Sequence, residues 1–177
     1  MELRRDALAG AARAVLALRD EALSRDDMTA NVGVISAEPG GFNVVPGAAE
    51  LTIDVRSPTP DGFARLEPFV RETLGLIAAE EDLGLELGET YCKEPVALDP
   101  ELQGALEDAA REEGASTLRL PSGAGHDAMV LAHHVPAAML FVPSRGGLSH
   151  TPEEFSEPEH CELGARVLAR TVRGLLS

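Results

Sequence analysis

The amino-acid sequence predicts a mixed α+β and α/β fold in two parts, residues 1–95 and residues 96–177. Two patterns carry this prediction. In the first part, apolar residues follow a helical spacing in some segments and a strict alternation in others, as in helices packed on an antiparallel sheet. In the second part, helical segments flank a short run that is apolar throughout, which is typical of an α/β layer.

Residues 4–24 open the first part with the pattern of an amphipathic helix. Apolar side chains recur every three to four positions, so they should form one buried stripe. The stripe comprises Leu8, Ala12, Val15, Leu16, Leu18, Ala22 and Leu23. A strand is expected over residues 28–37, followed by a Pro- and Gly-rich connection and a second strand over residues 49–57, in which apolar and polar side chains alternate.

A second helical pattern spans residues 57–84, and Pro68 is expected to start or kink its regular part. Residues 85–96 are expected to form a third strand. The order helix, strand, strand, helix, strand is one strand short of the ferredoxin-like βαββαβ unit, in which two helices cover one face of a four-stranded antiparallel sheet. The missing element is the first strand, which would precede residue 1.

The second part begins with a helix whose ends are clearly marked. Asp99 is the expected N-cap, Pro100 the first helical residue, and Gly114 the stop signal. Short strands are expected at residues 117–120 and 137–143. The second of these should be buried on both faces, because it is apolar throughout.

The last helix is expected to start with a capping box made by Ser156 and Glu159. One helix–strand–helix set cannot form a parallel sheet alone. Residues 96–177 therefore have the pattern of the end of an α/β domain.

The chain has 30 acidic and 15 basic residues, a formal charge of −15. This charge repels phosphates and anionic lipid, so neither nucleic acid nor a membrane is an expected partner. The sequence shows no membrane-spanning stretch and no signal-peptide pattern, and Cys92 and Cys161 form no CxxC pair. A cytoplasmic location is expected, with both cysteines as small, half-buried residues.

Three kinds of chemistry were compared for residues 122–155, which hold four of the five histidines. One is nucleotide binding, since Gly123, Gly125 and Ala128 match G-x-G-x-x-A, but no acidic residue ends the following strand as that fold requires. Another is a serine nucleophile, but no serine here stands in G-x-S-x-G.

Metal binding is the third and favoured chemistry. Nitrogen and oxygen ligands occur on the two loops that flank residues 137–143, where open α/β sheets bind ligands. These ligands are His126, Asp127, His150, Glu153 and Glu154. The other histidines are interpreted as structural: His133, His134 and His160.

Four ordered motifs give the chain a family resemblance over practically its whole length. They are "RRDALAGAARAVLALRDEAL", "FNVVPGAAELTIDVRS", "SGAGHDA" and "AAMLFVPSRGGLSHTPEEF". Together they resemble the C-terminal part of M20-type metal-dependent amidohydrolases, in the branch of N-carbamoyl-L-amino-acid hydrolases and allantoate amidohydrolases. The resemblance implies a ferredoxin-like lid and dimerisation domain at 1–95, without its first strand. It also implies the C-terminal part of an α/β zinc-hydrolase catalytic domain at 96–177, and a homodimer formed through the lid.

The resemblance also implies roles for single residues. His150 matches the C-terminal metal-ligand histidine, with Glu154 orienting it. His126 matches the histidine that stabilises the oxyanion of the tetrahedral intermediate, and the backbone around Gly125 would hold the substrate carboxylate. Two lid residues match groups that bind the same carboxylate, namely Asn43 and Arg56.

The implied function is metal-dependent hydrolysis of linear amide or ureido C–N bonds, most like that of N-carbamoyl-L-amino-acid hydrolase. Allantoate amidohydrolase and M20 peptidase are alternatives, and the expected partner is a small N-carbamoyl amino acid or ureido substrate. The family uses two divalent ions, zinc or else manganese or cobalt, but its other ligands and its general-base glutamate have no counterpart here. The chain is therefore expected to be part of a longer enzyme and inactive alone. A non-catalytic dimerisation module is the alternative from another class.

Overall fold

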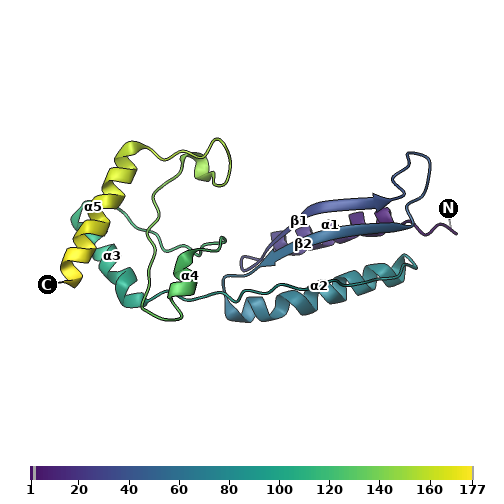
Figure 1. The fold of residues 1–177 in the computed structure, drawn as a ribbon, viewed down its shortest axis with the longest axis horizontal. Helices are drawn as coiled ribbons and strands as arrows, with labels where there is room; N and C mark the ends of the chain where they lie inside the picture. Colours follow the sequence, from purple (N-terminus) through teal and green to yellow (C-terminus); the bar gives the residue numbers. More distant parts are fainter. Residues whose placement is uncertain (2, 177) are drawn as a thin grey trace. The chain divides into compact units, whose positions relative to one another are not determined.

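The computed structural model describes Met1 and residues 3–176 and divides the chain into two compact units, Met1–Pro95 and Val96–Ser177. The first unit contains α1 (Ala7–Ser24), β1 (Thr29–Glu38), β2 (Ala48–Arg56) and α2 (Pro60–Glu80) (Figure 1). The second contains α3 (Pro100–Glu112), α4 (Asp127–Leu131), the 3-10 turn η1 (Arg145–Gly147) and α5 (Pro158–Leu175). The mixed α and β content is as predicted. Among the described residues, no helix is both long and apolar enough to cross a membrane.

The sheet of the first unit is an antiparallel hairpin. Thr29 pairs with Arg56 at one end, and Glu38 pairs with Ala48 next to the connecting loop. The predicted alternation along β2 is confirmed, because each apolar residue from Ala49 to Val55 is half-buried and each polar residue between them is exposed. The hairpin thus has one face toward the helices and one toward solvent.

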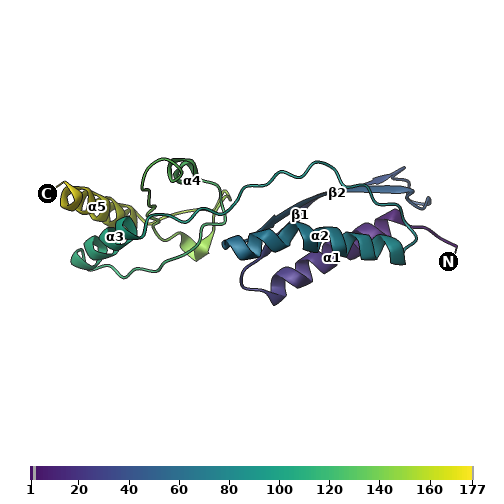
Figure 2. The ribbon, with the colours of Figure 1, turned by 90° about the horizontal axis from the view of Figure 1, so that it is seen from below.

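Helices α1 and α2 lie on the same face of the hairpin (Figure 2). The buried face of α1 differs from the predicted stripe, since Leu16 is 49% exposed and Leu23 is 77% exposed. The face that packs inward is made mostly of small residues: Gly10, Ala11, Ala14 and Leu18. Small side chains allow close approach, and a Cβ at Gly10 would lie 2.5 Å from Leu83 Cδ1. Close packing therefore selects this face rather than the one with more leucines.

The prediction that Pro68 starts or kinks the second helix is wrong about the start. Helix α2 begins at Pro60, eight residues earlier, and Pro68 lies inside it. Thr59 is the N-cap, and its Oγ1 accepts a hydrogen bond from Gly62 N at 3.1 Å. A capping threonine followed by proline at the first helical position is a strong start signal, and it fixes the boundary here.

The third predicted strand, residues 85–96, is not formed. The described part of the chain contains one sheet, and it has only the strands β1 and β2. Residues 85–96 have a single β-branched residue before the terminal Val96, namely Thr90, and they include Gly88 and Pro95. Intrinsic strand preference is therefore weak, and among the described residues this segment joins neither edge of the β1–β2 sheet.

Helices α3 and α5 pack together in the second unit around Ala109, Ala110 and Val167. The predicted ends of α3 are confirmed. Asp99 accepts a hydrogen bond from Leu102 N at 2.8 Å, and Gly114 adopts a left-handed conformation with φ of +76°. Such a glycine ends a helix at little steric cost.

The strands expected at residues 117–120 and 137–143 are also absent from the described structure. Phe141 is 56% exposed rather than buried on both faces. Backbone donors and acceptors in a strand need a paired neighbouring strand. Among the described residues, Asp99 N donates to the Ala137 carbonyl at 2.9 Å, but no strand pairs with either segment. Two smaller predictions are wrong as well: Glu157 rather than Ser156 is the N-cap of α5, and both cysteines are exposed.

Ion pairs between α3 and α5 supplement this small apolar core. Arg166 Nε lies 3.1 Å from Glu113 Oε2, and Arg170 Nη2 lies 2.6 Å from Glu113 Oε1. Arg170 also reaches Glu112 at 2.9 Å. The hydrogen bonds from Arg170 and then Arg166 hold the pKa of Glu113 below its ordinary value.

The packing of α1 predicts different costs for two leucines of that helix. Leu18 is 1% exposed, whereas Leu16 is 49% exposed. Leu18→Ala should lower the free energy of unfolding by about 2–5 kcal/mol, because it leaves a cavity in the core. Leu16→Ala should cost less than about 1 kcal/mol. Urea denaturation of both variants measures the difference, and equal costs would contradict the assigned face.

The lowered pKa of Glu113 predicts a pH-dependent contribution to stability. A carboxylate whose pKa is lowered by folding stabilises the protein above its unfolded pKa, and this effect is lost as pH falls through the folded pKa. Glu113→Gln should therefore lower the melting temperature near pH 6, and this effect should shrink progressively as pH falls below the ordinary carboxyl pKa of about 4. Glu89→Gln, in the unpaired segment, is the control, and the idea fails if both variants show the same pH profile.

Candidate functional site

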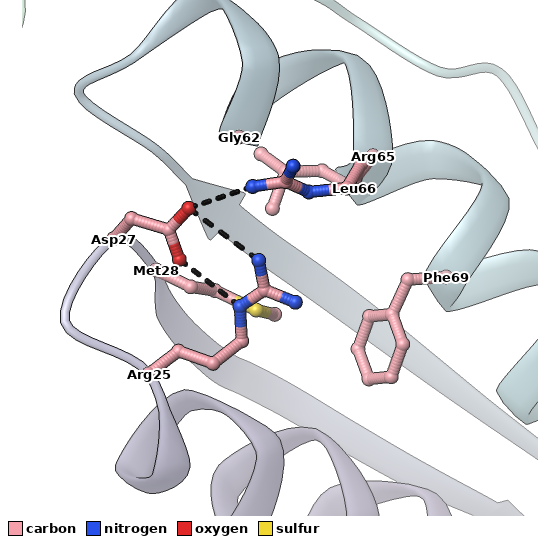
Figure 3. A pocket seen from close by; sticks show the side chains of 7 residues that line it. All are labelled: Arg25, Asp27, Met28, Gly62, Arg65, Leu66 and Phe69. Atoms are coloured by element: carbon pink, nitrogen blue, oxygen red, sulfur yellow. Dashed lines mark hydrogen bonds and ion pairs between the residues drawn. The ribbon is translucent and has the colours of Figure 1, made fainter.

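Two hollows in the structure lie away from the predicted site residues. The first, between α1, β1 and α2, is lined by residues including Arg25, Asp27 and Arg65 (Figure 3). Asp27 accepts hydrogen bonds from Arg25 Nε at 3.0 Å and Arg65 Nη2 at 2.9 Å, and the Arg25 bond lowers the pKa of Asp27. The volume of this first hollow is about 10 Å³, which is at the lower limit for a single water. It is therefore a gap in the packing around an ion-pair network.

The second hollow is an open groove of about 390 Å³ in the second unit. It lies between residues 97–100 and 132–137, and none of the predicted site residues line it. Its one ionisable residue, Asp99, is already occupied as the N-cap of α3. The candidate site is therefore built from the motif residues themselves.

His126 sits at the end of the Gly-rich turn 122–126, immediately before α4. Its backbone is extended, and its carbonyl accepts a hydrogen bond from Met129 N at 2.9 Å. Ser122 Oγ lies 2.8 Å from Nε2 of the half-buried ring. Phe141 meets the ring edge to face, with centroids 5.6 Å apart and planes at 63°. A polar and an aromatic contact thus fix the orientation of this imidazole.

His150 lies in a closed loop over residues 144–155. Arg145 N donates to the Phe155 carbonyl at 2.8 Å, and the Arg145 guanidinium lies 4.6 Å from the Phe155 ring centroid. Ser144 Oγ donates to the Leu148 carbonyl at 2.6 Å. His150 itself is exposed and adopts a left-handed conformation with φ of +59°. Strained backbone of this kind is concentrated at functional sites.

Glu154 contacts His150, but at the backbone and not at the ring. Its Oε2 accepts a hydrogen bond from His150 N at 2.7 Å. The carboxylate therefore stabilises the unusual backbone conformation of His150. The structure shows no contact between Glu154 and the imidazole, so the predicted orienting of the ring is replaced by support of the backbone.

The described residues do not complete a metal site by themselves. Over Met1 and residues 3–176, no group of three or more His, Cys, Asp or Glu side chains could hold a metal ion. A catalytic zinc has three protein ligands as a rule. His150 can supply one, but the described residues do not assemble a set of three around it.

Arg56 ends β2 on its solvent-facing side. Its Nε donates to Asp54 Oδ1 at 2.9 Å, and its Nη2 also contacts Asp54. The hydrogen bonds lower the pKa of Asp54 and raise the pKa of Arg56. Residues two apart in a strand share a face, so the Asp-Val-Arg sequence presents a charged guanidinium already oriented by its neighbour.

Asn43 lies in the loop between β1 and β2, within a turn closed by the hydrogen bond from Val44 N to the Gly41 carbonyl at 3.2 Å. Arg56 pairs with Thr29 at the opposite end of the hairpin. At the rise of an antiparallel strand, the eight steps from Ala48 to Arg56 cover roughly 26 Å. One chain therefore does not bring Asn43 and Arg56 together.

Sequence reasoning missed three residues that hold the predicted ones in place: Ser122, Phe141 and Asp54. Two of them could have been found. Ser122 stands four residues before His126 across a Gly-rich turn, and Asp54 stands two before Arg56 on the same strand face. Phe141 is brought to His126 by the fold, and nothing in the local sequence signals that contact.

Similar chains among known proteins include the following three. The allantoate amidohydrolase of Bacillus subtilis (strain 168) is 38% identical over 170 residues, covering 95% of this chain and 41% of that protein. The N-carbamoyl-L-amino-acid amidohydrolase of Paenarthrobacter aurescens is 35% identical over 176 residues, which cover 99% of this chain and 43% of that protein. The crystal structure of an amidase of the hydantoinase/carbamoylase family from Burkholderia multivorans has a TM-score of 0.90 and 37% identity. The match covers 97% of this chain and 42% of the amidase chain.

The chain thus spans about two fifths of the length of the curated relatives that it matches. The family described as "Peptidase family M20/M25/M40" matches residues 3–174. This match covers nearly the whole chain and agrees with the resemblance predicted from the four motifs. The chain belongs to peptidase family M20/M25/M40.

Proposed function

We propose that this chain is part of an amidohydrolase that cleaves a linear amide or ureido C–N bond, most like an N-carbamoyl-L-amino-acid hydrolase. The observation that carries the proposal is His126, an imidazole held by Ser122 and Phe141 at a Gly-rich turn, in a chain 35% identical to an enzyme of that name. An oriented imidazole N–H is a suitable donor to the oxyanion that forms when a carbonyl carbon is attacked.

We assign residues 1–95 to a lid and dimerisation domain and residues 96–177 to the C-terminal part of a catalytic domain. Arg56 would bind the substrate carboxylate, and its bond to Asp54 supports this role because it orients the guanidinium fork. Gly125 would let that carboxylate approach the backbone. A Cβ there would meet no other atom within 4 Å, so packing does not require glycine, and close approach of a ligand is a reason for it.

The separation of Asn43 and Arg56 supports a homodimer. A substrate as small as an N-carbamoyl amino acid does not span the roughly 26 Å between the ends of the hairpin. If both residues bind one carboxylate, they come from two different subunits. The exposed leucines of α1, Leu8, Leu16 and Leu23, offer an apolar surface for such pairing.

The same surface favours a second candidate function, a dimerisation module without catalysis. The two candidate functions differ in the role of His126. An oriented imidazole serves catalysis in the enzyme, whereas a dimerisation module does not require one. The exposed, unpaired cysteines fit a reducing compartment, and we infer a cytoplasmic location for either function.

The proposed enzyme would use two divalent ions, zinc or else manganese or cobalt, with His150 as one ligand. Because the described residues do not assemble three ligands, we expect the remaining donors to come from outside these 177 residues. The chain alone is then expected to be inactive. The chain would contribute a hydrogen-bond donor at His126, a binding group for the substrate carboxylate at Arg56 and a single metal ligand at His150.

The test of this proposal is a chimera in which the chain replaces the matched segment of the Paenarthrobacter aurescens relative. The chimera should bind metal and hydrolyse N-carbamoyl amino acids, while the chain alone should do neither.

In the same chimera, His126→Ala should lower kcat by about 100- to 1,000-fold, as expected for loss of an oxyanion donor. His133→Ala, at an exposed histidine, is the control. A metal-loaded chimera in which His126→Ala keeps full activity would exclude this role.

The proposed binding of the substrate carboxylate by Arg56 can be tested in the same chimera with two variants, which distinguish the charge of the side chain from its planar shape. Arg56→Lys keeps the charge but loses the planar fork, and Arg56→Ala loses both. A charged hydrogen bond contributes about 1.5–3 kcal/mol, so Arg56→Ala should raise KM for carboxylate-bearing substrates at least tenfold, with a smaller rise for the lysine variant. Arg65→Ala, which loses a pair with Asp27, is the matched control. Unchanged KM in Arg56→Ala would refute carboxylate binding.

A further inference from the structure

We propose that Ser122 is a positioning residue that keeps Nε2 of His126 protonated and fixes the direction of its N–H. This inference rests on the proposed function for its purpose, because the oxyanion role needs an N–H at Nε2. The structural claim, that Ser122 accepts a hydrogen bond from Nε2, stands on the contacts of the turn and can be tested without activity.

The Ser122 hydroxyl is held in place by its own turn. Oγ accepts a hydrogen bond from Ala124 N at 3.3 Å and lies 3.3 Å from the Ala124 carbonyl oxygen. The backbone from Ser122 to His126 therefore fixes the oxygen that faces Nε2 at 2.8 Å. A partner fixed in this way can select one protonation site of a neutral imidazole, because each ring nitrogen is either a donor or an acceptor.

Counting donors and acceptors selects the Nε2–H form. A serine hydroxyl donates one hydrogen bond and accepts two. If Nε2 donates to Oγ, then Oγ accepts from Nε2 and from Ala124 N, and it donates to the Ala124 carbonyl. All three geometric contacts are then satisfied. If the hydroxyl donates to Nε2 instead, the contact with the Ala124 carbonyl has no proton.

Phe141 completes the arrangement from a distant part of the chain. Its edge-to-face contact at 5.6 Å limits rotation of the imidazole about the bond to Cβ. With the ring angle and the protonated nitrogen both fixed, Nε2–H is a donor that a substrate oxygen beside Ser122 Oγ can share. The proton stays on Nε2, and no bond to hydrogen is broken.

Nitrogen-15 NMR of the histidines in the 177-residue chain tests the inference. Above the pH at which the ring deprotonates, His126 should show a single form with the proton on Nε2. Ser122→Ala should shift both ring nitrogens toward the mixture of forms of an unconstrained imidazole. Ser122→Thr, which keeps the hydroxyl, should restore the wild-type shifts. Ser149→Ala removes an exposed hydroxyl from the other histidine loop and should leave His126 unchanged.

Two results would overturn the inference: a wild-type His126 with its proton on Nδ1, or unchanged His126 nitrogen shifts in Ser122→Ala. Backbone spectra establish that each variant is folded, and Ser122 is exposed, so its replacement should not disturb the core. Because the measurement needs neither metal nor substrate, it is independent of the chimera. If the His126→Ala chimera is inactive while NMR of the 177-residue chain finds His126 unconstrained, the proposed function stands and the role of Ser122 is rejected.

Discussion

The pairing of backbone donors and acceptors is the constraint on which this structure depends. In the first unit, β1 and β2 satisfy each other over nine register pairs, and this hairpin supports α1 and α2. In the second unit, the apolar residues 137–143 join no sheet among the described residues, although Asp99 N donates to the Ala137 carbonyl at 2.9 Å. The loops on either side are held instead by short turns and side-chain bonds, such as those from Ser122 to Ala124 and from Ser144 to Leu148.

Local anchoring has a direct consequence for the candidate site. The ring of His126 is bound by a residue four positions away, and the guanidinium of Arg56 by a residue two positions away. Each group is therefore oriented by a residue of its own motif, and Phe141 adds a contact to His126 from a remote segment. Short motifs of this kind keep their geometry with few tertiary contacts. His126 and Arg56 were predicted from the family resemblance of such motifs, and their roles stay predictions.

The same distinction explains what the sequence could and could not predict. The capped helix α3 and the alternation along β2 depend on local chemistry, and both were predicted correctly. Strands at 85–96 and 137–143 depend on a partner that local pattern cannot supply, and both predictions were wrong. The buried face of α1 was misjudged for a related reason, because apolar spacing reports hydrophobicity but not which face can approach the sheet closely.

The backbone of His150 adopts a conformation that is uncommon for a residue other than glycine. Gly146 and Gly147, in the same loop, have positive φ angles that glycine adopts freely, and His150 shares that conformation without glycine's freedom. A side chain there costs about 1–2 kcal/mol. Glu154 offsets part of this cost through its bond to His150 N, and it leaves the ring exposed. An imidazole that is held in a costly conformation, and is yet left accessible, has the properties that a ligand to an external group requires.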